Sequence, residues 1–156
     1  NYTFHGTDRV EFLISANKGQ KLMPLSRVAS GGELSRIMLA IKSVLADKDN
    51  VDTLIFDEID TGISGRAARK IAIQLKRVSK LRQVICITHL AQIAAIADNH
   101  MLIEKTTTGD KTYTSVSTLS GDSRISEVAR IMSGAEITEN LYKTAKELIE
   151  VESAEE

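Results

Sequence analysis

Three acidic residues follow one short apolar run in this sequence. Asp57, Glu58 and Asp60 fall within four positions after TLIF, and a buried strand has little reason to end in carboxylates unless a cation or a reacting group uses them. At a strand end, Asp57 can meet Mg²⁺ directly or through a bound water, while Glu58 can orient an attacking water. The alternative interpretation is a solvated acidic turn.

A second candidate group, Ser30, Gly31 and Gly32, opens a strongly apolar helix. The backbone N–H groups of such a turn and the helix dipole attract a phosphate, and the Ser30 hydroxyl adds a donor. The alternative is that Ser30 caps the helix and that the glycines before it are only flexible.

The third candidate is His89, which directly follows the apolar run at residues 83–88. If this run and residues 53–58 form parallel strands, His89 and Asp57 lie at the same sheet edge, and ligands bind outside the carboxyl ends of parallel strands. A structural role is the alternative for a lone histidine at a strand end. His5 and His100 have no comparable context, and we interpret both as structural.

The elements that must position these residues follow the order of an α/β domain. We expect strands at residues 10–16, 53–58 and 83–88, helices at 33–46, 64–83 and 90–98, and an antiparallel hairpin at 100–119. Helices at about 123–132 and 138–151 close the chain. Because strands and helices alternate, the sequence predicts a parallel α/β core. The helix at 33–46 is apolar on nearly every side and is expected to be largely buried.

Composition places the chain among ordinary globular domains. Its 156 residues make one domain or a large piece of one, and a net charge of −1 argues against wholesale nucleic-acid wrapping. The single cysteine, Cys86, indicates a reducing compartment and is interpreted as a buried small hydrophobe. No apolar run approaches the ~20 residues that span a bilayer, so we expect a cytoplasmic protein without a membrane partner. Because the first residue is Asn1 rather than Met, we expect a fragment of a longer polypeptide.

One basic stretch of the sequence is relevant to DNA binding. Residues 64–83 contain seven basic side chains and no acidic one, and such a stripe can contact phosphates. A solvated face of an amphipathic helix is the alternative. The basic residues are Arg66, Arg69, Lys70, Lys76, Arg77, Lys80 and Arg82.

The three candidate groups occur in an order that resembles a known family. The stretches VASGGELSRIMLAIKSVLA, DTLIFDEIDTGISGRAA and QVICITHLAQIAAIAD resemble the signature motif, Walker B strand and switch histidine of ABC-type ATPase heads, in particular those of bacterial DNA repair relatives of the SMC proteins. The resemblance runs from about Val10 to the final helix. It implies that residues 1–156 form the C-terminal half of an ABC/SMC-type head, with a mostly parallel sheet core flanked by helices, a C-terminal hairpin and two helices.

The resemblance also implies roles for single residues. In this family two heads sandwich two ATP molecules, and Ser30, Gly31, Gly32 and Glu33 stand in the signature motif, whose first three residues would contact the γ-phosphate of the nucleotide held by the opposite head. Asp57 would bind Mg²⁺ and Glu58 would act as the general base. His89 would lie near the γ-phosphate.

A missing motif matters as much as those present. The phosphate-binding pattern G-x-x-x-x-G-K-[ST] does not occur in the chain, so the resemblance implies an N-terminal Walker A lobe of the same polypeptide as a partner, and an isolated chain that is inactive. The intact protein would hydrolyse ATP, pair its heads, bind DNA and act in recombinational repair of double-strand breaks in the bacterial cytoplasm, at the nucleoid. The alternatives are another SMC-class head, or a non-catalytic head–head interaction lobe, which would gain nothing from adjacent carboxylates at a strand end.

Overall fold

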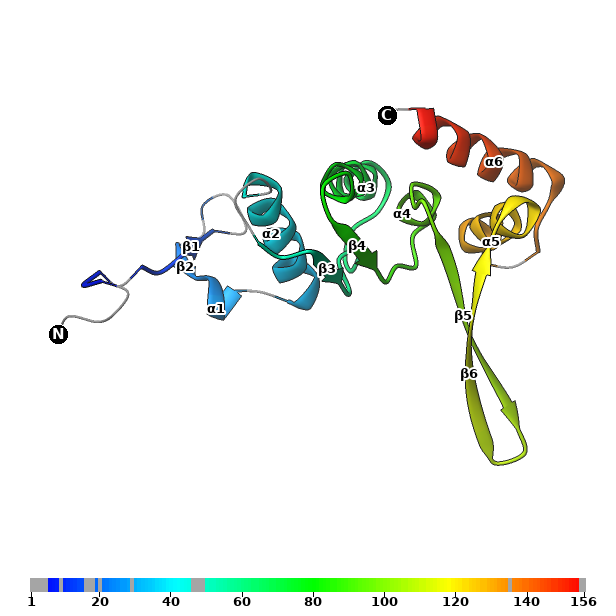
Figure 1. The fold of residues 1–156 in the computed structure, drawn as a ribbon, viewed down its shortest axis with the longest axis horizontal. Helices are drawn as coiled ribbons and strands as arrows, with labels where there is room; N and C mark the ends of the chain where they lie inside the picture. The colour runs from blue at the N-terminus through cyan, green and yellow to red at the C-terminus, as the bar shows by residue number, and fades with distance from the viewer. Residues whose placement is uncertain are drawn as a thin grey trace.

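The computed structural model describes residues 6–8, 10–15, 19, 21–28, 30–45, 50–134 and 136–154. Its elements are β1 (Leu13–Ile14), β2 (Met23–Pro24), α1 (Leu25–Val28), α2 (Gly31–Val44), β3 (Thr53–Phe56), α3 (Gly65–Ser79), β4 (Gln83–Cys86), α4 (Ala91–Ala95), β5 (His100–Thr108), β6 (Lys111–Leu119), α5 (Gly121–Ser133) and α6 (Glu139–Ala154). Figure 1 shows an elongated arrangement, with the β5–β6 hairpin projecting away from the helices.

The central element is the parallel pair of β3 and β4, which are joined through α3. Thr53 pairs with Gln83, and the register continues to Phe56 opposite Cys86. One further bond prolongs the pairing, because the N–H of Ile87 donates to the carbonyl of Phe56 at 2.9 Å. Both strands therefore end at the same edge, as the sequence predicts, and the residues that follow them are brought together there.

The main core lies between this pair and the helices α2, α3 and α4. Side chains alternate along β3, so that Leu54 and Phe56 are buried while Ile55 is exposed. On α3 the buried residues recur at helical spacing and face the same core. The buried members of this cluster are Leu39, Leu54, Phe56, Ile59, Ala72, Leu75, Val78, Ile93 and Ile96.

A second, smaller core joins α4 to the two last helices. Small side chains make it, which lets the helices approach closely; they are Ala91, Ala94, Ala95, Val128, Ala129 and Ala145. Arg124 links α5 to the end of α4, because its guanidinium donates to the carbonyls of Ala95 (2.7 Å) and Ala97 (2.6 Å). Gly134 ends α5 in the left-handed conformation, with φ +66°.

Several predicted elements differ from the structure. The prediction of a strand at 10–16 is wrong for most of its described residues. Only Leu13 and Ile14 pair, because their partner β2 is itself two residues long. Residue 16 lies outside the described residues, as does His5. The strands expected at 53–58 and 83–88 end two residues earlier.

The helix α2 is also less buried than its sequence predicts. Only Gly32 and Leu39 are buried on it, and Val44 is 85% exposed. Leu34 and Met38 are exposed as well. Among the described residues of α2, Leu39 alone enters the main core, so Leu34 and Met38 gain no burial there.

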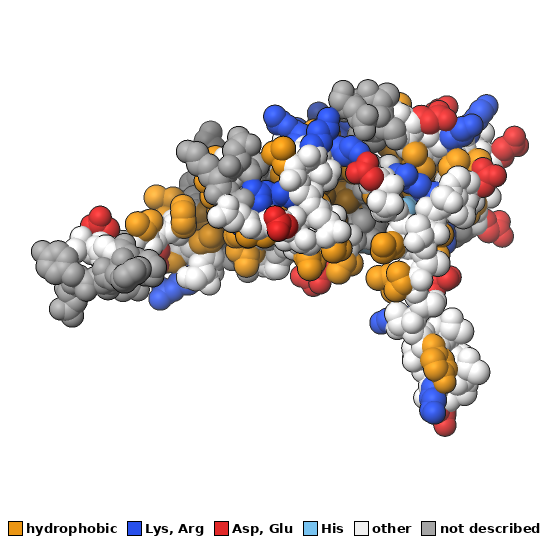
Figure 2. Space-filling view, viewed as in Figure 1, with side chains coloured by type: hydrophobic (Ala, Val, Ile, Leu, Met, Phe, Trp, Pro, Cys, Tyr) orange, Lys and Arg blue, Asp and Glu red, His pale blue; other side chains and the backbone are white. Residues whose placement is uncertain are grey.

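The antiparallel hairpin expected at 100–119 is confirmed, with His100 opposite Leu119 and Thr108 opposite Lys111. Figure 2 shows apolar side chains on the projecting hairpin, and Met101, Ile103 and Val116 are more than half exposed. Burial lowers the pKa of His100, and the charge of Arg124 lowers it further. Among the described residues, no helix is both long and apolar enough to cross a membrane.

Candidate functional site

The turn after β3 separates its acidic residues into two environments. Asp57 and Glu58 are exposed, whereas Asp60 is only 2% exposed and Ile59 is completely buried. The turn closes through a bond from the N–H of Thr61 to the carbonyl of Glu58, at 3.0 Å. Because Ile59 enters the main core between them, Glu58 and Asp60 point to different sides, and only Asp57 and Glu58 remain open to solvent.

Glu58 has a left-handed backbone, with φ +56°, which is the one positive φ at a non-glycine residue among the described positions. Residues with a side chain rarely adopt this conformation, and such outliers cluster at functional sites.

The start of α2 is a reciprocal cap. The N–H of Glu33 donates to Ser30 Oγ at 3.4 Å, and the N–H of Ser30 donates to the Glu33 carboxylate at 3.3 Å. Ser30 is thus the N-cap that the alternative interpretation expected, with Glu33 completing the capping box. Gly31 and Gly32 are the first two residues of α2, where backbone N–H groups have no carbonyl partner within the helix. These N–H groups can therefore bind an anion.

The structure packs this cap directly against the acidic turn. A Cβ atom added to Gly31 would overlap a carboxylate oxygen of Glu58, and one added to Gly32 would lie 2.7 Å from the Glu58 carbonyl oxygen. Close approach of the backbone therefore requires glycine at position 32, whereas at Gly31 the overlapping atom is the end of a flexible side chain. The resemblance assigns Gly31 to the nucleotide of the opposite head and Glu58 to that of its own head, whereas in the single chain the two residues are adjacent.

Two residues that the sequence did not single out hold α2 to this turn. Ser35 Oγ donates to the carbonyl of Asp57 at 2.8 Å. The Arg36 guanidinium donates to the carbonyls of Ile59 (3.1 Å) and Thr61 (2.9 Å). Both lie one turn after the glycines, a position that carries no signal in the sequence because the partners are backbone atoms.

These contacts predict different outcomes for two alanine substitutions. Gly32→Ala is expected to lower the free energy of unfolding by about 1–3 kcal/mol, because its Cβ would meet a backbone oxygen that cannot move alone. Gly31→Ala is the matched control: its Cβ meets only the end of a flexible side chain, and we expect a change within about 0.5 kcal/mol. Urea denaturation of both variants measures the difference, and equal losses would contradict the close approach at Gly32.

His89 is connected to the acidic turn, as the parallel strands predict. Asp60 Oδ2 accepts the N–H of His89 at 2.8 Å and lies 3.0 Å from His89 Nδ1, and it accepts the Thr88 hydroxyl at 2.6 Å. The imidazole itself is 71% exposed. The sequence placed Asp60 in the acidic cluster but did not predict that it is buried and bonded to the residues after β4.

Cys86 is half-buried, whereas the sequence predicts a buried small hydrophobe. It packs beside the main core, and burial, followed by the negative charges of Asp60 and Asp57, raises the pKa of its thiol to about 12. The thiol is therefore protonated at neutral pH and poorly nucleophilic.

The described residues could supply only part of the ligands of a Mg²⁺ ion. The described residues contain no cluster of three or more metal-ligating side chains. The exposed carboxylate of Asp57 offers one ligand, and Mg²⁺ is usually held by one or two carboxylates with waters and phosphate oxygens. Asp57 therefore fits a site whose other ligands come from a nucleotide and from elsewhere.

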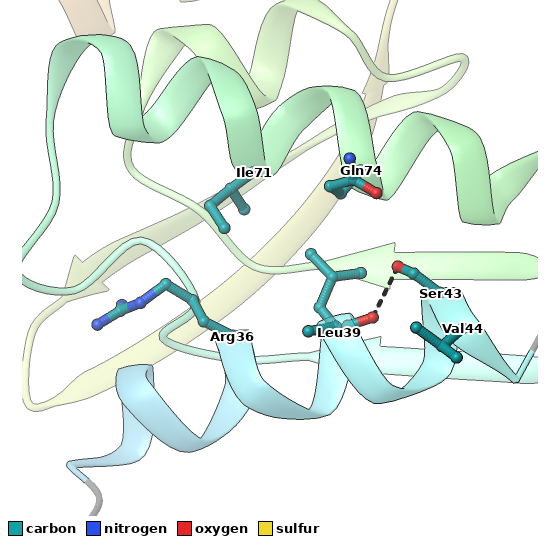
Figure 3. A pocket seen from close by; sticks show the side chains of 7 residues that line it. Arg36, Leu39, Ser43, Val44, Ile71 and Gln74 are labelled. Carbon is teal, nitrogen blue, oxygen red and sulfur yellow. Dashed lines mark hydrogen bonds between the residues drawn. The ribbon is translucent and has the colours of Figure 1, made fainter. Parts of the chain in front are cut away.

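The hollow in Figure 3 is a separate feature. It lies between α2 and α3, with Leu39 and Ile71 facing one another across it, and Ser43 is bonded to the carbonyl of Leu39 at 2.7 Å. Its one charged side chain, Arg36, already donates to the carbonyls of Ile59 and Thr61, so the hollow is a poor phosphate site. The lining residues are Arg36, Leu39, Ala40, Ser43, Val44, Ile71 and Gln74.

Comparisons with known proteins bear on the fold and on the sequence of the chain. No protein-family model matches the chain. A solved structure from work on ATP-driven dimerization and DNA stimulated activation of SMC ATPases is 23% identical, with a TM-score of 0.50 over 76% of this chain and 70% of that one. The chain therefore shares the fold of that structure over this range, which confirms the predicted α/β fold class.

The sequence comparison is more specific. The chain is 51% identical to the DNA repair protein RecN of Treponema pallidum over 145 residues and 50% identical to that of Bacillus subtilis over 147 residues, or 93% and 94% of its length. It corresponds to the C-terminal segment of RecN proteins. It spans about a quarter of the length of these relatives, 25% and 26%.

Proposed function

We propose that this chain is the C-terminal half of an ATP-hydrolysing head in a RecN-type protein, which acts in the recombinational repair of DNA double-strand breaks. The observation that carries the proposal is the convergence of three motifs: the cap of α2, the acidic turn after β3 and His89 after β4 are linked by direct contacts. The two relatives named above are DNA repair proteins of bacteria, which fits action at the nucleoid.

Each exposed residue of the site would have a different role in ATP hydrolysis. Asp57 would hold Mg²⁺, which neutralises phosphate charge when it is bound with ATP. Glu58 has an exposed carboxylate that can accept a proton from an attacking water, and His89 has an exposed imidazole that can contact the transferred phosphoryl group. The N–H groups at the start of α2, Gly31 first among them, would contact the nucleotide of a second head.

An N-terminal lobe of the same polypeptide is the first proposed partner. One side of the β3–β4 pair is apolar and uncovered by the described elements: Ile55, Ile85 and Ile87 are 68%, 44% and 50% exposed. Strands buried on both sides are typical of parallel sheets, so this side fits further elements of a head. The same lobe would supply the phosphate-binding lysine loop that the chain lacks.

The second proposed partner is another head, held through ATP. In the single chain Glu58 covers Gly31, and an ATP molecule between two heads would have to displace this side chain from the glycine. The Glu58 carboxylate is exposed and can rotate towards its own nucleotide, which would at the same time open the cap for the nucleotide of the partner.

DNA is the third proposed partner, and α3 offers it little support. Lys76 is paired with Asp98 at 2.5 Å, and Arg82 donates to the carbonyl of Val51. The remaining basic residues lie on the side of α3 away from the core and fit a solvated face. DNA contact is therefore proposed for the intact protein, not for this helix.

Calorimetry with Mg²⁺ and ATP tests the proposal. We expect no binding by this chain alone, and binding after it is mixed with the N-terminal segment, because the two halves supply different phosphate contacts. The same mixture without Mg²⁺, or with Asp57→Asn, should bind more weakly. Tight binding by the isolated chain would contradict the half-site, and a mixture that binds ATP without hydrolysing it would favour the non-catalytic interaction lobe.

A further inference from the structure

A single oxygen of Asp60 accepts two hydrogen bonds and lies within ion-pair distance of a ring nitrogen. Asp60 Oδ2 lies 2.6 Å from the Thr88 hydroxyl, 2.8 Å from the backbone nitrogen of His89 and 3.0 Å from His89 Nδ1. The side chain is 2% exposed. A buried carboxylate is costly unless donors surround its charge, so the three contacts explain how it is tolerated between Ile59 and the end of β4.

The three groups around this oxygen all come from the segment that follows β4, whereas Asp60 belongs to the turn that follows β3. Thr88 continues the network, because its hydroxyl oxygen accepts the N–H of Leu90 at 3.0 Å, immediately before α4. The carboxylate thus holds the backbone of this segment through hydrogen bonds, and its oxygen lies 3.0 Å from Nδ1 of the His89 ring. A backbone contact alone would hold the segment without orienting the ring.

The contact with Nδ1 determines which ring nitrogen remains available. An imidazole that donates its Nδ1 proton to a carboxylate has its Nε2 free to accept a hydrogen bond, or to donate one when the ring is protonated. We propose that Asp60 is a positioning residue, which holds the His89 ring through Nδ1 so that Nε2 faces the phosphoryl group during ATP hydrolysis. The inference rests on the proposed function, in which His89 contacts that group, and extends it to a residue that touches no substrate.

A double-mutant cycle in the intact protein tests the coupling. Asp60→Asn keeps the size of the side chain and removes its charge, and we expect about a tenfold loss of kcat with ATP affinity unchanged. In a His89→Ala background the same substitution should cost nothing further, since the ring that it orients is gone. Asp110→Asn, at an exposed position beyond β5, is the matched control and should leave kcat unchanged.

A spectroscopic measurement separates the inference from the proposed function. With ¹⁵N-labelled histidine, the ring signals of His89 are identified by their loss in His89→Ala. We expect the neutral ring to carry its proton on Nδ1 in the unchanged protein, and to lose this preference in Asp60→Asn but not in Asp110→Asn.

The outcomes are distinguishable. Equal losses of kcat from Asp60→Asn in both backgrounds would show a structural role and overturn the inference, as would a neutral His89 with its proton on Nε2. If His89→Ala leaves kcat unchanged, the proposed role of His89 in hydrolysis fails and the inference fails with it as a statement about catalysis. The ring signals would then still show whether Asp60 orients the imidazole.

Discussion

Glu58→Gln is expected to lower ATP hydrolysis by the intact protein at least about 100-fold while ATP binding is retained. The amide has the shape of the carboxylate but cannot accept a proton from the attacking water. Glu58 is exposed and its side chain lies beside the N-cap of α2, so the substitution removes no buried contact. Turnover at saturating ATP and calorimetric affinity, measured on the same preparation, separate the chemical step from binding.

The matched control is Glu104→Gln, an exposed position on the hairpin strand β5, and its turnover should equal that of the unchanged protein. Full activity in Glu58→Gln would remove Glu58 from the role of base. A parallel loss of ATP affinity would instead indicate that the carboxylate supports the site structurally.

Ile59→Ala is expected to lower the free energy of unfolding of this chain by about 2–5 kcal/mol. Ile59 is completely buried in the main core, and it is the anchor between Glu58 and Asp60. Its loss would leave a cavity directly beneath the turn. The acidic residues would lose their support, and denaturation by urea, followed by the amplitude of helical circular dichroism, measures the cost.

Ile55→Ala removes the same atoms from β3, four residues earlier, where the side chain is 68% exposed. We expect it to cost less than about 1 kcal/mol in the isolated chain, because little apolar surface returns to water. Similar losses for the two variants would contradict the assignment of Ile59 as the anchor of the turn.

The pairing of β3 with β4 could be predicted because its signals are local. Each strand is a short apolar run, and the amphipathic segment between them is long enough to cross over and return in parallel. Strand ends were less predictable. The polar residues Asp57 and Thr88 are compatible with a strand, and only the positive φ of Glu58 and the bonds to Asp60 show where the regular pairing stops.

The candidate site could be predicted in its members but not in its contacts. Asp57, Glu58 and His89 follow strands whose direction the sequence indicates, and their catalytic roles stay predictions. The burial of Asp60 depends on donors about thirty positions away. The close approach of Gly32 to the Glu58 carbonyl depends on how α2 packs. Neither contact produces a periodic pattern in the sequence. The exposure of Val44 was missed for the same reason, since periodicity does not say which face finds a partner.

The left-handed backbone of Glu58 has an evolutionary consequence. Glycine adopts φ +56° without a steric penalty, so folding alone would favour glycine at this position, and a glutamate there costs of order 1 kcal/mol. A lineage that no longer used this carboxylate would be free to replace it and gain stability. Under the proposed function, the glutamate would mark selection for activity over stability, and a head that had become a purely structural joint would be expected to lose it first.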